Sequence, residues 1–287
     1  MKISEVIERL KAYHPAVDES ITCDGYKSGN GENECTGIVS ALLPTMEVIK
    51  RTIKLGANLL IVHEPTYYLT PDFPEWRGGF ENAVQREKRE LLEKHHITIW
   101  RDHDRMHAHV PDTIFSGVMR EFGWEAYYRP ELADGVPIVY PFELPETTVG
   151  ELGAFLKGKL SLNGLRYIGD AKDQVTKVII TAHLYPNSFP GEGIGPDGYY
   201  RDYATFIMRL MEKYNIEVLI PGEIIEWNLL YYIRDGVQQG KNRACFNIGH
   251  FNLEELGMKA FADTLKNITN NEVPVTYVPS EDGFKYM

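Results

Sequence analysis

Short apolar runs alternate with amphipathic segments along most of the chain. Residues 37–43, 57–62 and 97–100 have the length and apolar content of buried strands, and each run precedes a segment with helical spacing of its apolar residues. The same alternation predicts further strands at residues 175–183, 216–222, 243–249 and 274–278. Continuous apolar strands that alternate with helices indicate an α/β fold with largely parallel sheets, covered by helices on both faces.

A stretch rich in Pro, Gly and acidic residues, at about 127–137, interrupts this pattern and indicates a boundary between two α/β lobes. We expect the first lobe at residues 1–128 and the second at 129–287, with the C-terminal segment returning to the site described below. Residues 184–203 are rich in Pro and Gly and show no periodicity, so they form either a functional lid or a surface insertion.

The amino-acid composition limits which partners and which cellular compartment we expect. The formal net charge is −11, from 41 acidic and 30 basic residues, which argues against nucleic acid or an anionic membrane as the main partner. Three cysteines without C-x-x-C spacing suggest a reducing compartment. The first fifteen residues fit an amphipathic helix rather than a signal peptide, and no apolar stretch is long enough to span a bilayer. We therefore expect a cytoplasmic protein.

Ligand-type residues follow three of the predicted strands. His63 and Glu64 come directly after the second strand, and His103 and His107 follow the third. His250 closes a later strand, and Glu254 follows it in the first turn of a helix for which Asn252 is the expected N-cap. In α/β sheets, functional groups gather in the crevice at the carboxyl ends of the strands, so we expect a metal site there.

Imidazole and carboxylate ligands together suit zinc, iron or manganese. Two such ions a few ångströms apart activate a water molecule for attack on a phosphoryl or carbonyl centre. Each residue also has a plainer interpretation: Glu254 suits the positive end of a helix, and histidines near strand ends are often structural hydrogen-bonding groups. The repetition of the pattern after three strands favours the metal-ligand interpretation.

These residues resemble those of the NGG-one-interacting-factor-three-like family, whose members are described as dinuclear-metal proteins that form hexameric rings. The resemblance runs from the opening helix through LLIVHEP and LIPGEIIEWNLLYY to NIGHFNLEELG. It implies a ligand set for two divalent ions, with two departures from the family pattern: a glutamate replaces the second histidine of a His-His-Pro motif, and a histidine replaces an aspartate. The implied ligands are His63, Glu64, His107, His250 and Glu254.

The resemblance also implies an activity, because some family members are named type two GTP cyclohydrolase. We expect a metal-dependent hydrolase acting on a small, nucleotide-like molecule, with Glu223 or His103 as base or proton shuttle. One alternative is a non-enzymatic, metal-binding ring that serves as a scaffold or regulatory partner. Another is a site that has lost its metal through the two replacements. His183 and Glu226 are further residues expected to add contacts or to be structural.

Overall fold

The computed structural model describes residues 1–287 and divides them into two compact units. The first unit contains Met1–Glu121 and Glu254–Glu281, and the second contains Phe122–Leu253 and Asp282–Met287. The boundary expected at residue 128 lies a few residues beyond the first crossing. Residues 122–128 group with the second unit because Trp124 packs against Phe142 and Phe155 there, with ring centroids 5.3 and 5.7 Å away.

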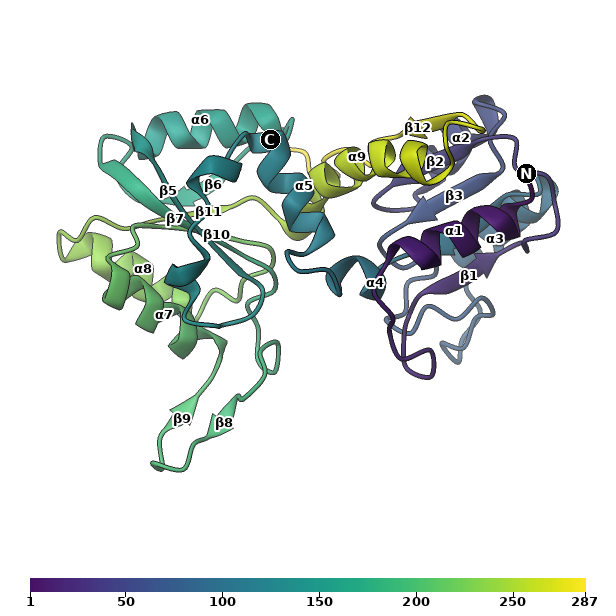
Figure 1. Cartoon of the computed structure of the whole chain (residues 1–287). Coiled ribbons are helices and arrows are strands. Elements are labelled where there is room, and N and C mark those ends of the chain that lie inside the picture. The colour runs from purple at the N-terminus through teal and green to yellow at the C-terminus, as the bar shows by residue number, and fades with distance from the viewer. The chain divides into compact units, whose positions relative to one another are not determined.

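The first unit is a mixed five-stranded sheet with helices on both faces (Figure 1). Its strands are β1 (Gly25–Ser28), β2 (Ile38–Ala41), β3 (Leu59–Val62), β4 (Thr98–Arg101) and β12 (Val275–Tyr277). Its helices are α1 (Ile3–Tyr13), α2 (Met46–Lys54), α3 (Ala83–Lys94), α4 (Asp104–His107), α5 (Thr113–Phe122) and most of α9 (His250–Ile268).

The strand order in this sheet is β1-β4-β3-β2-β12, and all neighbours are parallel except the edge pair β1 and β4. Every residue of the central strands is buried, which accounts for their unbroken apolar runs. The helices α2 and α3 cover one face, with Val48 and Leu92 in a cluster with Leu60. On the other face Ser40 donates a hydrogen bond to the Met258 carbonyl of α9.

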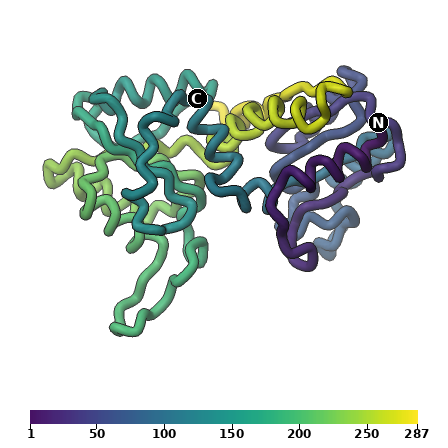
Figure 2. The backbone as a smooth tube through the Cα atoms, in the orientation of Figure 1, coloured from purple at the N-terminus to yellow at the C-terminus, as the bar shows by residue number.

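A segment from the far end of the chain completes the first sheet. The strand β12 pairs with β2, residue Val275 opposite Ile38, although more than two hundred residues separate them. Figure 2 shows this yellow C-terminal segment beside the purple N-terminal part of the chain. The helices α5 and α9 approach closely at two glycines, since a Cβ on Gly117 would lie 2.9 Å from the Cα of Gly257.

The second unit has a sheet in the order β5-β7-β10-β11-β6, with a parallel centre and antiparallel edge strands. The strands are β5 (Val139–Thr148), β6 (Arg166–Ile168), β7 (Gln174–Thr181), β10 (Val218–Pro221) and β11 (Ala244–Asn247). The helices are α6 (Val149–Lys159) on one face, and α7 (Tyr203–Tyr214) and α8 (Leu229–Gln238) on the other (Figure 1). Two 3-10 turns, η1 (Glu125–Tyr127) and η2 (Pro130–Ala133), precede β5.

The segment expected to be an irregular loop, residues 184–203, contains a short hairpin. The strands β8 (Gly193–Ile194) and β9 (Tyr200–Arg201) pair antiparallel and extend away from the sheet of their unit (Figure 1). Gly198 supplies the positive φ of +80° that the turn requires. Ile194, Tyr199 and Tyr200 are more than 60% exposed, so apolar side chains gather on this projection.

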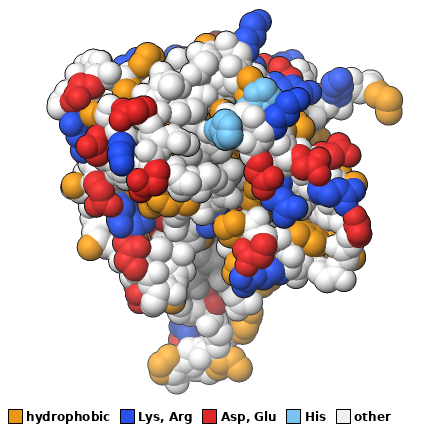
Figure 3. Space-filling model, turned by 90° about the vertical axis from the view of Figure 1, so that its right-hand side faces the viewer, with side chains coloured by type: hydrophobic (Ala, Val, Ile, Leu, Met, Phe, Trp, Pro, Cys, Tyr) orange, Lys and Arg blue, Asp and Glu red, His pale blue; other side chains and the backbone are white.

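The distribution of charge on the surface and the apolarity of the helices bear on possible partners. On the face drawn in Figure 3, acidic and basic side chains are interspersed, without one broad area of a single charge. No helix of this fold has both the length and the apolarity that crossing a bilayer requires.

Candidate metal centre

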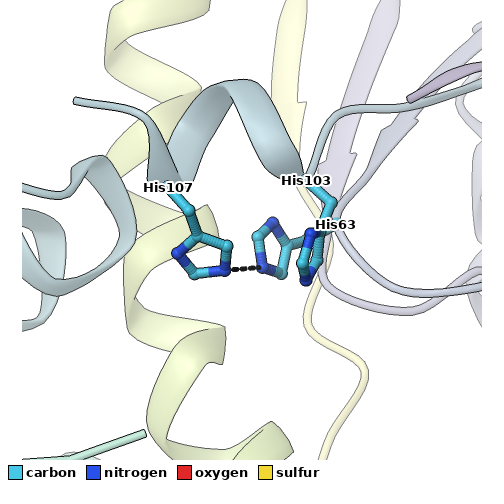
Figure 4. Close-up of side chains that lie close together, drawn as sticks. All are labelled: His63, His103 and His107. Atoms are coloured by element: carbon cyan, nitrogen blue, oxygen red, sulfur yellow. Dashed lines mark hydrogen bonds between the residues drawn. The ribbon is translucent and has the colours of Figure 1, made fainter. Parts of the chain in front are cut away.

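The carboxyl ends of β3 and β4 place three histidines in contact. His63 follows β3 directly, and β4 breaks after Arg101 into the single helical turn α4, which His103 precedes and His107 ends. The rings of His63 and His103 stack with centroids 4.4 Å apart, and His107 meets both rings edge-on (Figure 4). One nitrogen atom from each ring lies within 4.8 Å of the others.

Hydrogen bonds fix the orientation of two of these rings. The Nδ1 atom of His63 lies 3.1 Å from the Asp102 carbonyl oxygen, which can only accept. The Nδ1 atom of His107 lies 2.5 Å from the Asp112 carboxylate. When both Nδ1 atoms donate, both Nε2 atoms carry lone pairs, and these Nε2 atoms face each other at 3.1 Å (Figure 4).

Two lone pairs at this distance repel each other, so either a proton or a metal cation lies between the two nitrogen atoms. The surroundings favour positive charge. Burial lowers the pKa of His107, but the hydrogen bond and charge of Asp112, with the charges of Glu254 and Glu64, outweigh burial and raise it to about 9. Carboxylate-backed imidazoles of this kind are typical of metal-binding histidines.

Two buried carboxylates complete a second group around His63. Glu64 is 6% exposed and Glu254 is 2% exposed, and the Nε2 atom of His63 lies 3.5 Å from Oε2 of Glu254. One ligand atom from each of the three residues lies within the same 4.8 Å limit. His63 therefore belongs to two overlapping groups, one of three imidazoles and one of an imidazole with two carboxylates.

These separations fit ligands of one divalent ion. Zinc, for example, binds imidazole and carboxylate atoms at about 2.0–2.2 Å, so two ligands at tetrahedral or right angles lie roughly 2.8–3.6 Å apart. The distances of 3.1 Å between His63 and His107 and 3.5 Å between His63 and Glu254 are within that range. The donor set thus suits a metal ion without large rearrangement.

The remaining expected residues group in the second unit. His250 begins α9, and its Nδ1 atom lies 3.3 Å from Oε1 of Glu223. Glu223, which we expected to act as a base, also lies 3.2 Å from Nδ1 of His183. Glu226 is exposed and pairs with Arg166 at 3.5 Å. His63, Glu64, His107 and Glu254 therefore come together in the first unit, and His250 with Glu223 in the second.

Several contributing residues were missed in the sequence. Arg101 donates to the His63 carbonyl oxygen at 3.0 Å and approaches Glu64 at 3.9 Å. Asp24 receives the backbone N–H groups of His103, Asp104 and Arg105 at 2.6–3.1 Å, which holds the first turn of α4. Of these residues, Asp112 could most readily have been predicted, because an Asp one residue before a helical segment is a capping signal. In the structure its carboxylate accepts hydrogen bonds from the backbone N–H groups of Ile114 and Phe115.

The shape of α9 corrects one expectation. The helix begins at His250 rather than after an N-cap at Asn252, whose side chain donates to the Ile248 carbonyl oxygen at 2.8 Å. Glu255, three residues after Asn252, accepts from the Tyr277 hydroxyl and the Ser280 backbone N–H instead of contacting the start of the helix. Glu254 lies one helical turn beyond His250, farther into the helix than expected.

Comparisons with known proteins give a consistent result. The family described as Duf34/NIF3 (NGG1p interacting factor 3) matches residues 1–182. A relative from Clostridium perfringens, named GTP cyclohydrolase 1 type 2 homolog, is 23% identical over 293 residues and the match covers 100% of each chain.

Solved structures share the fold over nearly the full length. The Staphylococcus aureus hypothetical protein SA1388 aligns with a TM-score of 0.69 and 18% identity, over 100% of this chain and 99% of that one. A Bacillus cereus protein related to NIF3 aligns with a TM-score of 0.69 and 14% identity, with the same coverage. At these identities the similarity shows the fold, two α/β units with mixed sheets.

Proposed function

The chain belongs to the Duf34/NIF3 family, and from this premise we propose that it is a hydrolase that depends on two divalent metal ions. We assign His63, Glu64, His107 and Glu254 of the first unit as ligands. His250 stays a prediction as the fifth ligand, from the family resemblance. We propose zinc, iron or manganese as the ion, because the donors are imidazole and carboxylate groups.

The observation that carries the proposal is the pair of facing Nε2 atoms of His63 and His107. Each ring uses its other nitrogen on a protein acceptor, so the pair presents two lone pairs to one point once a metal ion displaces the proton that His107 holds. The buried carboxylates of Glu64 and Glu254 add negative charge near that point. A site built in this way binds a cation more strongly than it binds a neutral molecule.

Bound divalent ions supply Lewis acidity and lower the pKa of a water molecule, which provides a nucleophile near neutral pH. The residues of the chain supply orientation and proton transfer. Asp112 and the Asp102 carbonyl hold the rings of His107 and His63. His103 stacks on His63 and is 25% exposed, so it can exchange a proton between the site and solvent.

The name of the Clostridium perfringens relative supports a nucleotide-like small molecule as the substrate class. A second function, a metal-binding scaffold in a hexameric ring, is favoured by the exposed hairpin. Its Ile194, Tyr199 and Tyr200 are the kind of apolar side chains that an interface covers. Both functions require the metal ions, and turnover distinguishes them.

The test measures metal content by plasma mass spectrometry on protein purified without chelator or immobilised nickel. We expect about two ions per chain in the parent and a sharp loss of metal in His107→Ala and Glu254→Gln. The same variants should lose hydrolysis of GTP, of other nucleotides or of cyclic amides. His95→Ala is the control, because His95 is an exposed histidine at the end of α3. Equal metal content in the parent and both site variants would refute the dinuclear site. Metal loss without any hydrolysis by the parent would favour the scaffold.

A further inference from the structure

Three neighbouring parallel strands of the second unit each lead to a ligand-type side chain. The strands β7, β10 and β11 lie side by side in the sheet. His183 follows the end of β7 by two residues, Glu223 follows β10 by two, and His250 follows β11 by three. Since the carboxyl ends of parallel strands share one edge of the sheet, the fold delivers all three side chains to one place.

The three side chains converge on the Glu223 carboxylate. Nδ1 of His183 lies 3.2 Å from Oε2, and Nδ1 of His250 lies 3.3 Å from Oε1. The two imidazole rings are 4.3 Å apart and nearly perpendicular. One ligand atom from each residue lies within 4.8 Å of the others, and the nitrogen–oxygen distances fall in the range of roughly 2.8–3.6 Å for ligands of one ion.

The surroundings of the group favour the entry of a cation. The Nδ1 atom of His183 is shielded from solvent, and its approach to Glu223 lacks the alignment of a hydrogen bond. Glu223 itself is 53% exposed, which leaves a path for an ion to enter.

The backbone holds two of the three residues in register. The Leu184 N–H donates to the Glu223 carbonyl oxygen at 2.7 Å, and the Ile225 N–H donates to the Leu184 carbonyl oxygen at 3.2 Å. Gly222 permits this approach, because a Cβ there would lie 2.8 Å from the Ala182 carbonyl oxygen. The segments that follow β7 and β10 are thus fixed to each other, and little ordering is left for a ligand to impose.

We propose that His183, Glu223 and Nδ1 of His250 form a mononuclear divalent-metal site that belongs entirely to the second unit. Two imidazoles and one carboxylate suit Zn²⁺, Fe²⁺ or Mn²⁺ and leave coordination positions for water or for an oxygen of a bound molecule. The site uses none of His63, Glu64, His107 and Glu254 of the first unit. It shares His250 with the predicted dinuclear centre through the other ring nitrogen, and its test does not depend on hydrolase activity.

The experiment uses the full chain, stripped of metal and brought to equilibrium by dialysis against a series of free Zn²⁺ concentrations. The variants are His183→Ala and Glu223→Gln, which leave the residues of the first unit unchanged. Glu226→Gln is the matched control for the carboxylate, since Glu226 lies three residues away and pairs with Arg166. His95→Ala is the control for binding to a surface histidine, and His107→Ala separates the ions of the first unit.

We expect the affinity for one Zn²⁺ per chain to fall at least tenfold in His183→Ala and in Glu223→Gln, because losing even an outer partner of a ligand costs about 10- to 100-fold. His107→Ala should keep that ion, and both control variants should match the parent. Identical Zn²⁺ isotherms for the parent, His183→Ala and Glu223→Gln would overturn the proposal and leave the group as a carboxylate paired with two imidazoles.

A measurement on the parent alone keeps the test valid if a variant folds poorly. Zn²⁺ should slow amide hydrogen exchange in peptides that cover residues 182–185 and 222–225, because a bound ion stabilises the conformation it binds. This protection should persist in His107→Ala, which distinguishes the second-unit site from the proposed dinuclear centre. Unchanged exchange in these peptides at saturating Zn²⁺ would refute the site independently.

Discussion

Replacing Gly257 by alanine sets two effects of opposite sign against each other. In an exposed helix, alanine is more favourable than glycine by about 1 kcal/mol because it restricts the unfolded backbone. At this position, however, a Cβ atom would lie 2.7 Å from the Ile114 carbonyl oxygen and 2.9 Å from the Ile114 Cα. Ordinary contacts begin at 3.4 Å, so the overlap with the carbonyl oxygen is about 0.7 Å.

The steric effect should win. The obstructing atoms include the backbone of α5, which cannot turn aside as a side chain can, so α5 and α9 must move apart. Overpacking of this kind costs about 1–3 kcal/mol. After the gain in helix propensity is subtracted, we expect Gly257→Ala to destabilise the first unit by about 1–2 kcal/mol. Because Glu254 lies one turn earlier on α9, the same movement should weaken metal binding.

Gly158 provides the matched control. It is an exposed glycine in α6, and a Cβ there would meet no heavy atom within 4 Å. Gly158→Ala should therefore stabilise the second unit by up to about 1 kcal/mol. Amide hydrogen exchange is the suitable assay, since a chain of two units need not unfold in one step and exchange reports each unit separately. Slower exchange of the α9 amides in Gly257→Ala would refute the reasoning.

Three further outcomes follow from single side chains. Asp112→Asn should weaken Zn²⁺ binding at the first unit by about 10- to 100-fold in a competition titration, because it removes the charged acceptor of His107; an unchanged affinity would show that Asp112 does not orient the ligand. Burial, opposed by the charge of Asp72, lowers the pKa of Lys88 to about 8 from its ordinary value of 10.5. Between these two pH values the unfolded chain therefore binds more protons than the folded chain. The free energy of unfolding should thus rise with pH in that window, by up to about 3 kcal/mol more in the parent than in Lys88→Met. Denaturant titrations that give parallel pH profiles for the two proteins would contradict this. Asp24→Ala should raise the exchange rates of the α4 amides, because it removes the acceptor of three backbone N–H groups, and unaltered rates would show that this cap is dispensable.

The central strands were predictable because burial on both faces imposes an unbroken apolar run, as in β3 and β10. Of the edge strands, only β12 was predicted, and β1, β5 and β6 were not. In β5, Pro141 and Pro145 interrupt the pattern, which an edge position tolerates because one side of the strand needs no partner. The strands β1 and β6 are short and partly exposed, so their residues carry no continuous apolar signal.

The residues of the metal centre were likewise predictable only in part. His63 and Glu64 were visible because they directly follow a buried strand, a purely local signal. The role of Arg101 depends on which strand lies beside β3, and that of Asp24 depends on the antiparallel pairing of β1 with β4, which places Gly25 opposite Arg101. Such contacts are set by tertiary structure, and no local sequence pattern predicts them.

The interrupted first unit has a consequence for the order of folding during synthesis. All strands of the second sheet lie between residues 139 and 247, whereas the first sheet needs β12, at Val275–Tyr277. A ribosome therefore finishes the elements of the second sheet while the earlier-made β2 still has an open edge and lacks the covering helix α9. The sheet that is begun first is completed last, so a nascent chain halted before residue 275 would expose an unpaired β-edge to other chains.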